Sequence, residues 1–87
     1  MGHDSLNNPE ILAEAFSSVL REVRKKRGLS QEALGFESGY HRTYVSLLER
    51  GLKSPSLQTI FNLARALDIL PSEMLSRVER KTCRKLK

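Results

Sequence analysis

The sequence predicts an all-α fold of five short helices in one small domain. Apolar residues recur at three- and four-residue steps along the chain, and no alternating run indicates a strand. Helix caps and glycines divide these periodic stretches, and 87 residues suffice for a single core. We expect the domain to span residues 9–78, between a flexible arm at residues 1–8 and a basic tail at residues 79–87.

The first helix is predicted to begin at Pro9. Asn8 is a good N-cap, proline fits the first helical position, and Glu10 favours the positive end of the helix dipole. One apolar stripe then runs along the helix and should face the core: Leu12, Phe16, Val19, Leu20 and Val23. Gly28 is expected to end this helix.

Residues 29–51 are expected to form two helices joined by a tight turn. Ser30 caps the first, and Gly39 ends it because glycine takes the left-handed conformation without steric cost. The second helix runs from near His41 to about Arg50, and Gly51 stops it. Two short helices separated by a turn with glycine are typical of the helix-turn-helix motif.

The second helix of this motif has two faces. Tyr44, Val45 and Leu48 are spaced to face a core. The opposite face carries Arg42, Thr43, Ser46 and Leu47. Arginine, threonine and serine at a helix N-terminus suit the base edges of a DNA major groove. The alternative is an ordinary solvated face of a small helical bundle.

The last two helices carry much apolar surface. Ser56 is expected to cap the fourth helix, Asp68 to end it, and Pro71 to open the fifth. The apolar positions of the fourth helix are Leu57, Ile60, Phe61, Leu63, Ala64 and Leu67. The residues that exceed the needs of one small core suggest a homodimer interface: Ile69, Leu70, Met74 and Val78. Alternatively, they close the core over the first helix.

The net charge of +5 is unevenly distributed. The excess lies in the C-terminal eleven residues, where a single acidic residue, Glu79, accompanies these basic ones: Arg77, Arg80, Lys81, Arg84, Lys85 and Lys87. The body must therefore attract nucleic acid by local clustering, for example at residues 24–27, where the alternative is that cations complement a helix end. The tail can act as a non-specific electrostatic arm.

Several functional classes find no support. Cys83 is the only cysteine, which fits a reducing cytosol. The chain has neither a membrane-spanning apolar run nor a signal-peptide pattern. No Cys/His spacing suits a metal, no Gly-rich loop cradles a phosphate, and His3 and His41 stand alone. We expect a cytoplasmic protein that is not an enzyme and needs no cofactor, metal or membrane.

The segments GLSQE, ESG, RTYVS, ERG, PSLQT, LARAL and PSEM follow one another in order. In this order and spacing the chain resembles the Cro/CI-type (XRE) helix-turn-helix family over about residues 12–78. RTYVSLLERG followed by SPSLQTI looks most like the controller proteins of restriction–modification systems. The resemblance implies a lambda-repressor-like fold and a homodimer that regulates transcription from a two-fold-symmetric operator, including its own. Activation would also need contact with RNA polymerase.

The resemblance also implies residue roles. Arg42 and Thr43 would read bases, with Ser46 on a base or a phosphate. Phosphate contacts would come from Gln31, Tyr44, Arg50, Lys53 and Ser54. Arg24 and Glu49 match a charge pair that ties helices together in some relatives.

The chain departs from the family pattern before the second helix of the motif. His41 stands where Ser, Thr or Asp commonly caps this helix, so it either caps weakly or contacts DNA. Tyr40 replaces a smaller apolar residue. Two alternative functions remain: an antitoxin-type module that binds DNA and a partner protein, and a phage-type repressor.

Overall fold

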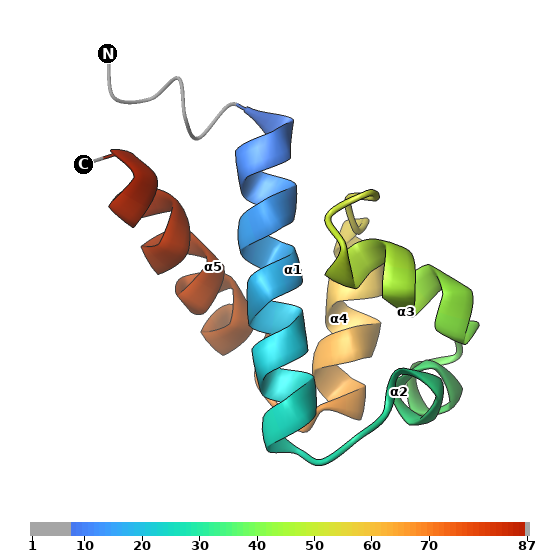
Figure 1. Cartoon of the computed structure of the whole chain (residues 1–87). Helices are drawn as coiled ribbons and strands as arrows, with labels where there is room; N and C mark the ends of the chain where they lie inside the picture. The colour runs from blue at the N-terminus through green and yellow to red at the C-terminus, as the bar shows by residue number, and fades with distance from the viewer. Residues whose placement is uncertain (1–7, 87) are drawn as a thin grey trace.

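The chain forms five helices in the computed structural model, which describes residues 8–86 and their side chains as far as Thr82. They are α1 (Pro9–Lys26), α2 (Gln31–Ser38), α3 (Arg42–Glu49), α4 (Leu57–Ala66) and α5 (Pro71–Leu86) (Figure 1). The predicted all-α class is confirmed. The expected arm lies outside the described residues except for Asn8, as do the side chains of Cys83, Arg84, Lys85 and Lys87.

Side-chain caps fix where the helices begin. Asn8 Oδ1 accepts a hydrogen bond from Glu10 N at 2.8 Å, and Ser30 Oγ accepts one from Ala33 N at 2.9 Å. Ser56 Oγ accepts one from Thr59 N at 3.1 Å. Asp68 adopts φ 57° after α4, where a left-handed residue was predicted. These contacts confirm the predicted boundaries. The boundaries could be predicted because a cap depends only on residues that are close in sequence.

The core lies among all five helices, with α1 packed against α3 and α5. Each helix contributes at least one nearly fully buried side chain, among them Leu20, Leu34, Leu48, Leu63 and Met74. The expectation that Leu12 joins this core is wrong, since 47% of it is exposed. It sits at the rim of a groove of about 120 Å³ that Phe16, Ile60 and Leu75 also line.

Two residues of the expected dimer interface belong to this core instead. Met74 is 0% exposed and Val78 is 4% exposed, because α5 turns them toward the interior. The alternative that they close the core is therefore correct, and neither can touch a partner. Ile69 packs against the core and is half-buried, whereas Leu70 is 70% exposed. On α4, Leu57 and Phe61 are also open, at 67% and 48% exposed, although they share the apolar pattern of this helix with its buried residues.

Helix α5 continues through the segment that the sequence assigned to a tail. It lies beside α1 (Figure 1), and Lys81 Nζ donates a hydrogen bond to Glu22 Oε2 at 3.0 Å. Thr82 is 1% exposed, and its hydroxyl donates to the carbonyl oxygen of Glu79. Residues 79–82 are thus part of the packed helical body. Among the described helices, none is long and apolar enough to cross a membrane.

Candidate nucleic-acid interface

The turn between α2 and α3 depends on two glycines. Gly39 takes φ 87°, and its N–H bonds to the carbonyl of Gly35 at the end of α2. The Tyr40 N–H bonds to the same carbonyl at 2.7 Å. A Cβ at Gly35 would lie 2.5 Å from the carbonyl oxygen of Tyr40, so the turn can pass this close only over a glycine. The two helices are therefore held in the short helix-turn-helix connection that the sequence predicted.

His41 caps α3, because its Nδ1 accepts a hydrogen bond from Thr43 N at 3.1 Å. Of the two alternatives for His41, the structure shows the cap, and a contact with DNA stays a prediction. The residue remains exposed at the start of the helix.

Helix α3 is amphipathic, with its outer face widest at the N-terminal end. Val45 and Leu48 are 0% exposed, whereas Arg42 and Thr43 are exposed. Ser46 and Leu47 are half-buried. The structure therefore brings the predicted base-reading side chains to one face of one helix, although only those of the first turn project freely.

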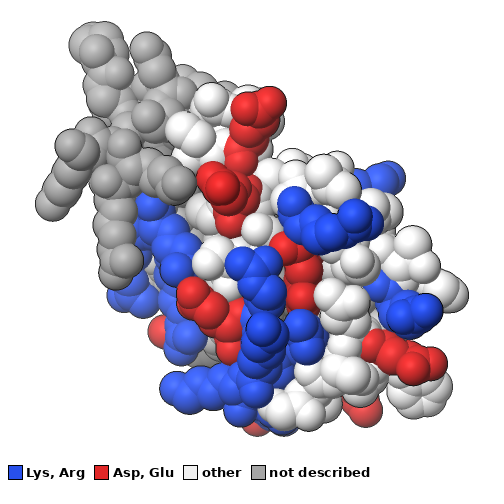
Figure 2. Space-filling view, viewed as in Figure 1, with Lys and Arg blue, Asp and Glu red and all other residues white. Residues whose placement is uncertain are grey.

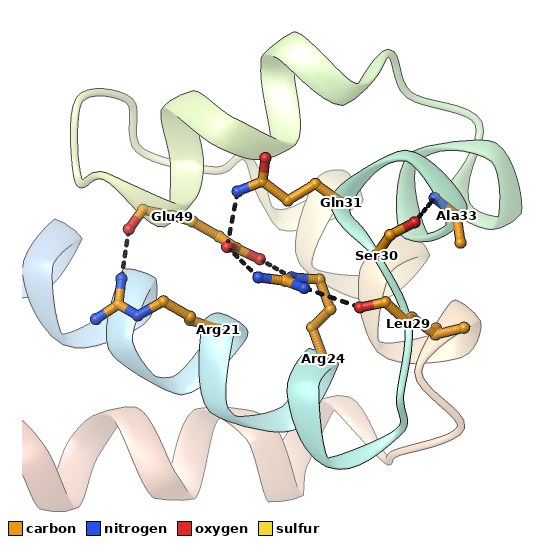
Figure 3. Close-up of polar contacts among 7 residues, drawn as sticks. All are labelled: Arg21, Arg24, Leu29, Ser30, Gln31, Ala33 and Glu49. Atoms are coloured by element: carbon orange, nitrogen blue, oxygen red, sulfur yellow. Dashed lines mark hydrogen bonds and ion pairs between the residues drawn. The ribbon is translucent and has the colours of Figure 1, made fainter.

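Glu49 anchors the other end of α3 (Figure 3). Its carboxylate, on a residue only 3% exposed, accepts hydrogen bonds from Arg24 Nε at 2.5 Å and Arg24 Nη2 at 2.9 Å. This confirms the predicted pair between α1 and α3. Arg24 Nη1 also donates to the carbonyl oxygen of Leu29 at 2.8 Å, so one guanidinium ties together α1, α3 and the entry to α2.

Two further side chains complete this network. Gln31 Nε2 donates to Glu49 Oε1 at 3.0 Å, so the amide group expected on a phosphate is half-buried and bound within the protein. Arg21 Nη1 donates to the backbone oxygen of Glu49 at 2.7 Å and thereby satisfies a carbonyl at the end of α3. Sequence reasoning missed Arg21, because this residue lies outside the apolar stripe of α1 and no motif includes it. Its spacing of three residues from Arg24 is the signal that it shares that neighbourhood.

Tyr44 is turned toward α4. Its hydroxyl lies 3.4 Å from Thr59 Oγ1, and its ring contacts that of Tyr40 at a centroid distance of 5.1 Å. Tyr44 is half-buried, so the ring packs inward as expected. A contact between its hydroxyl and a phosphate stays a prediction.

The remaining predicted phosphate ligands follow α3. Arg50, Lys53 and Ser54 are all exposed in and after its C-terminal cap. Glu10 and Glu14 share a surface hollow with Arg50, so the field near this arginine is less positive than the local sequence suggests. Lys53 lies beyond Gly51 in the connection between α3 and α4, and it carries a positive charge there.

Basic side chains gather elsewhere on the surface as well. Figure 2 shows Lys and Arg more densely over α1 and α5 than over α2 and α3 on the visible face. Within residues 24–27, Arg24 binds Glu49, and Arg27 Nη1 donates to the carbonyl oxygen of Leu67 at 2.9 Å. The arginines of this cluster are thus engaged in contacts within the protein, whereas its two lysines are exposed. No group of three potential metal ligands occurs among the described side chains.

Comparisons with known proteins match this chain across the same helices. A family profile described as "Helix-turn-helix" matches residues 20–75. The control protein C.BamHI of Bacillus amyloliquefaciens is 40% identical over 70 residues, which cover 79% of this chain and 83% of that protein.

Two solved structures extend the comparison. The restriction–modification controller protein C.AhdI from Aeromonas hydrophila matches with a TM-score of 0.69 at 50% identity, covering 71% of this chain and 94% of that one. The controller protein C.Esp1396I, solved as a tetramer with its natural 35-base-pair operator, matches with a TM-score of 0.76 at 22% identity. That match covers 83% of this chain and 95% of the other, and it supports the fold alone.

Proposed function

Since this chain belongs to the helix-turn-helix family that includes the restriction–modification control proteins, we propose that it is a sequence-specific regulator of transcription. It acts as a homodimer on a two-fold-symmetric operator in double-stranded DNA. The observation that carries this proposal is the exposed N-terminal end of α3, where Arg42 and Thr43 project from a helix that is anchored at Glu49. Its gene context would be a restriction–modification operon, including its own promoter, as the names of its relatives suggest.

Base reading is assigned to the outer face of α3. Arginine offers paired donors to guanine O6 and N7, and a threonine methyl can contact a thymine methyl. Arg42 and Thr43 therefore carry most of the discrimination. His41, Ser46 and Leu47 flank them and contact bases only where the groove comes close.

Phosphate contacts position α3 without reading sequence. We assign this role to Lys53, Arg50 and Ser54, which are exposed beyond the end of α3. Gln31 and Tyr44 reach a phosphate only with the atoms that their internal hydrogen bonds leave free. If the protein activates transcription, it also contacts RNA polymerase.

We assign the homodimer interface to apolar residues that are exposed to solvent in the single protomer. Leu57 and Phe61 lie one turn apart on α4 and line a shared surface hollow. Leu70 is retained from the expected interface, whereas Met74 and Val78 are excluded by their burial. An operator with two-fold symmetry requires such a dimer to hold its two α3 helices on one side of the duplex, about 34 Å apart.

The test compares Arg42→Ala with Lys53→Ala by competition binding. It uses two duplexes of equal length: the operator duplex, which the wild-type chain enriches from a random pool, and a scrambled one. Arg42→Ala should lower affinity for the operator by about 5- to 150-fold, the equivalent of about 1–3 kcal/mol, and should change scrambled-duplex binding far less. Lys53→Ala should lower the affinity for both duplexes alike. It should also reduce the slope of log affinity against log salt concentration by about 1. Equal losses on both duplexes for Arg42→Ala would remove its assignment as a base-reading residue.

A further inference from the structure

A second polar network lies at the opposite end of α3 from Glu49. Its centre is the hydroxyl of Thr59, a residue of α4 that is 5% exposed. The Tyr40 hydroxyl donates to Thr59 Oγ1 at 3.1 Å, and Ser56 Oγ donates to it at 3.0 Å. Asn62 Nδ2 in turn donates to the Tyr40 hydroxyl at 3.0 Å. This network joins the first two turns of α4 to the residue just before the His41 cap.

The Thr59 hydroxyl takes part in three contacts at once, which its one proton and two lone pairs allow. Its Oγ1 accepts from Tyr40 and from Ser56, and it lies 3.4 Å from the Tyr44 hydroxyl, where either oxygen can be the donor. Tyr44 is therefore joined to the same network as Tyr40.

The network holds the end of α3 that faces DNA. Tyr40 precedes His41 directly, and Tyr44 adjoins Thr43 on the first turns of the helix. The rings of Tyr40 and Tyr44 pack against each other at 47°, so the two hydroxyls reach Thr59 from adjacent positions. Apolar packing alone tolerates small shifts, whereas directional hydrogen bonds weaken steeply when their geometry changes.

We propose that Tyr40 and Thr59 are positioning residues that set the orientation of α3 on DNA and thereby the sequence discrimination of Arg42 and Thr43. This inference rests on the proposed DNA-binding function. Thr59 is buried, so it acts through Tyr40 and Tyr44 and touches no base. A displacement of about 1 Å at a recognition site is enough to weaken a bidentate contact, because such contacts depend on distance and angle.

The experiment uses Thr59→Val, which keeps the shape of the side chain and removes its hydroxyl. Affinity is measured at about 150 mM salt for two duplexes: the one that the wild-type chain enriches from a random pool, and a scrambled duplex of equal length. The ratio of the two affinities should fall by about 3- to 10-fold, as expected for the loss of one to two hydrogen bonds. Thr59→Ser, which restores the hydroxyl, should recover the wild-type ratio.

Urea unfolding of each variant separates orientation from stability. A network that only stabilises the fold would lower the unfolding midpoint of Thr59→Val and leave the affinity ratio unchanged, which would overturn the proposal. If Thr59→Val does not fold, Tyr40→Phe replaces it, because it retains the ring and removes one hydroxyl. The ratio should fall for this variant too, and an unchanged ratio would equally overturn the proposal.

The wild-type chain separates this inference from the proposed function. If it shows no preference for an enriched duplex, the DNA-reading function fails and the positioning role fails with it. If it prefers the enriched duplex and both Thr59→Val and Tyr40→Phe keep the same affinity ratio as the wild-type chain, only the positioning role is wrong.

Discussion

Glu49 joins three parts of the molecule through one buried side chain. Its carboxylate binds Arg24 of α1 and Gln31 of α2, while its backbone oxygen accepts from Arg21. A buried charge pair contributes little net stability, because both ions lose their hydration. Removing one partner is costly, since the other charge is then left buried and unpaired.

We therefore expect Glu49→Ala to lower the free energy of unfolding by about 3–5 kcal/mol. The double variant Arg24→Met/Glu49→Leu should lose much less, because no unpaired charge remains in it. Urea unfolding measures both, with the exposed Glu32→Ala as a control expected to change stability by less than about 0.5 kcal/mol. A double variant less stable than Glu49→Ala would contradict this account of the pair.

At the residue scale, the sequence predicted contacts better than exposure. The pair of Arg24 and Glu49 was accessible from the family resemblance, and it is present. The sequence left Met74 open between a dimer contact and the core, where it lies, and it placed Leu12 in the core, although 47% of Leu12 is exposed. Helical periodicity identifies an apolar stripe but does not reveal which part of it another helix covers.

At the scale of the elements, α1 and α5 are joined at the surface as well as in the core. Lys81 Nζ bonds to Glu22 Oε2 at 3.0 Å. This hydrogen bond, with the charge of Lys81, holds the pKa of the Glu22 carboxyl below its ordinary value, and the Ser18 hydroxyl acts in the same direction. The deprotonated form is therefore favoured in the folded state relative to the unfolded state.

This linkage predicts a pH dependence. A carboxyl group whose pKa is lowered by folding stabilises the fold above its unfolded pKa of about 4.3, and this contribution is lost as the pH falls through the lower folded pKa. Glu22→Gln should therefore lower the melting temperature slightly at pH 7, by the equivalent of about 0.2–1 kcal/mol for an exposed pair. The difference from wild type should shrink as the pH approaches 3.

The control for this experiment is Glu37→Gln on α2. Glu37 is exposed, and its carboxylate makes no hydrogen bond or ion pair with another described residue. It should show no comparable difference at pH 7. A difference for Glu22→Gln that stays constant from pH 7 to pH 3 would exclude the ion pair as its cause.

The helix boundaries could be predicted closely, and the physical reason is that caps act locally. Ser30, Ser56 and His41 each accept a backbone N–H two or three residues ahead, and Asp68 takes a left-handed conformation after α4. The continuation of α5 beyond Glu79 was harder to predict, because the sequence there has few apolar residues. Its stability comes from contact with α1, including the bond of Lys81, and not from a local signal.

At the scale of the whole molecule, the proposed function requires two protomers. One α3 presents only a few exposed side chains, and an operator with two-fold symmetry needs a second copy in fixed relation to the first. The exposed apolar residues of α4 are the surface we assign to this contact. Their exposure could not be predicted from sequence, because Leu57 and Phe61 share the helical spacing of buried neighbours such as Leu63 and Ala64.

Phe61→Glu should convert the dimer to a monomer, because a charge would be buried at the contact without a partner. Sedimentation at micromolar concentration measures the change, and circular dichroism checks that the helices remain. Phe36→Glu is the matched control, since Phe36 is 86% exposed on α2. A dimer that persists in Phe61→Glu and dissociates in Phe36→Glu would contradict an interface on α4 and assign it to α2.

The central claim is that two copies of α3 read one symmetric operator. The most direct test selects from a random duplex pool with the purified wild-type chain at about 150 mM salt. We predict an enriched motif of two related half-sites in inverted orientation, with centres about 10–10.5 base pairs apart. Failure to enrich any motif, with binding that only fades as salt increases, would contradict the claim and leave a non-specific electrostatic contact in its place.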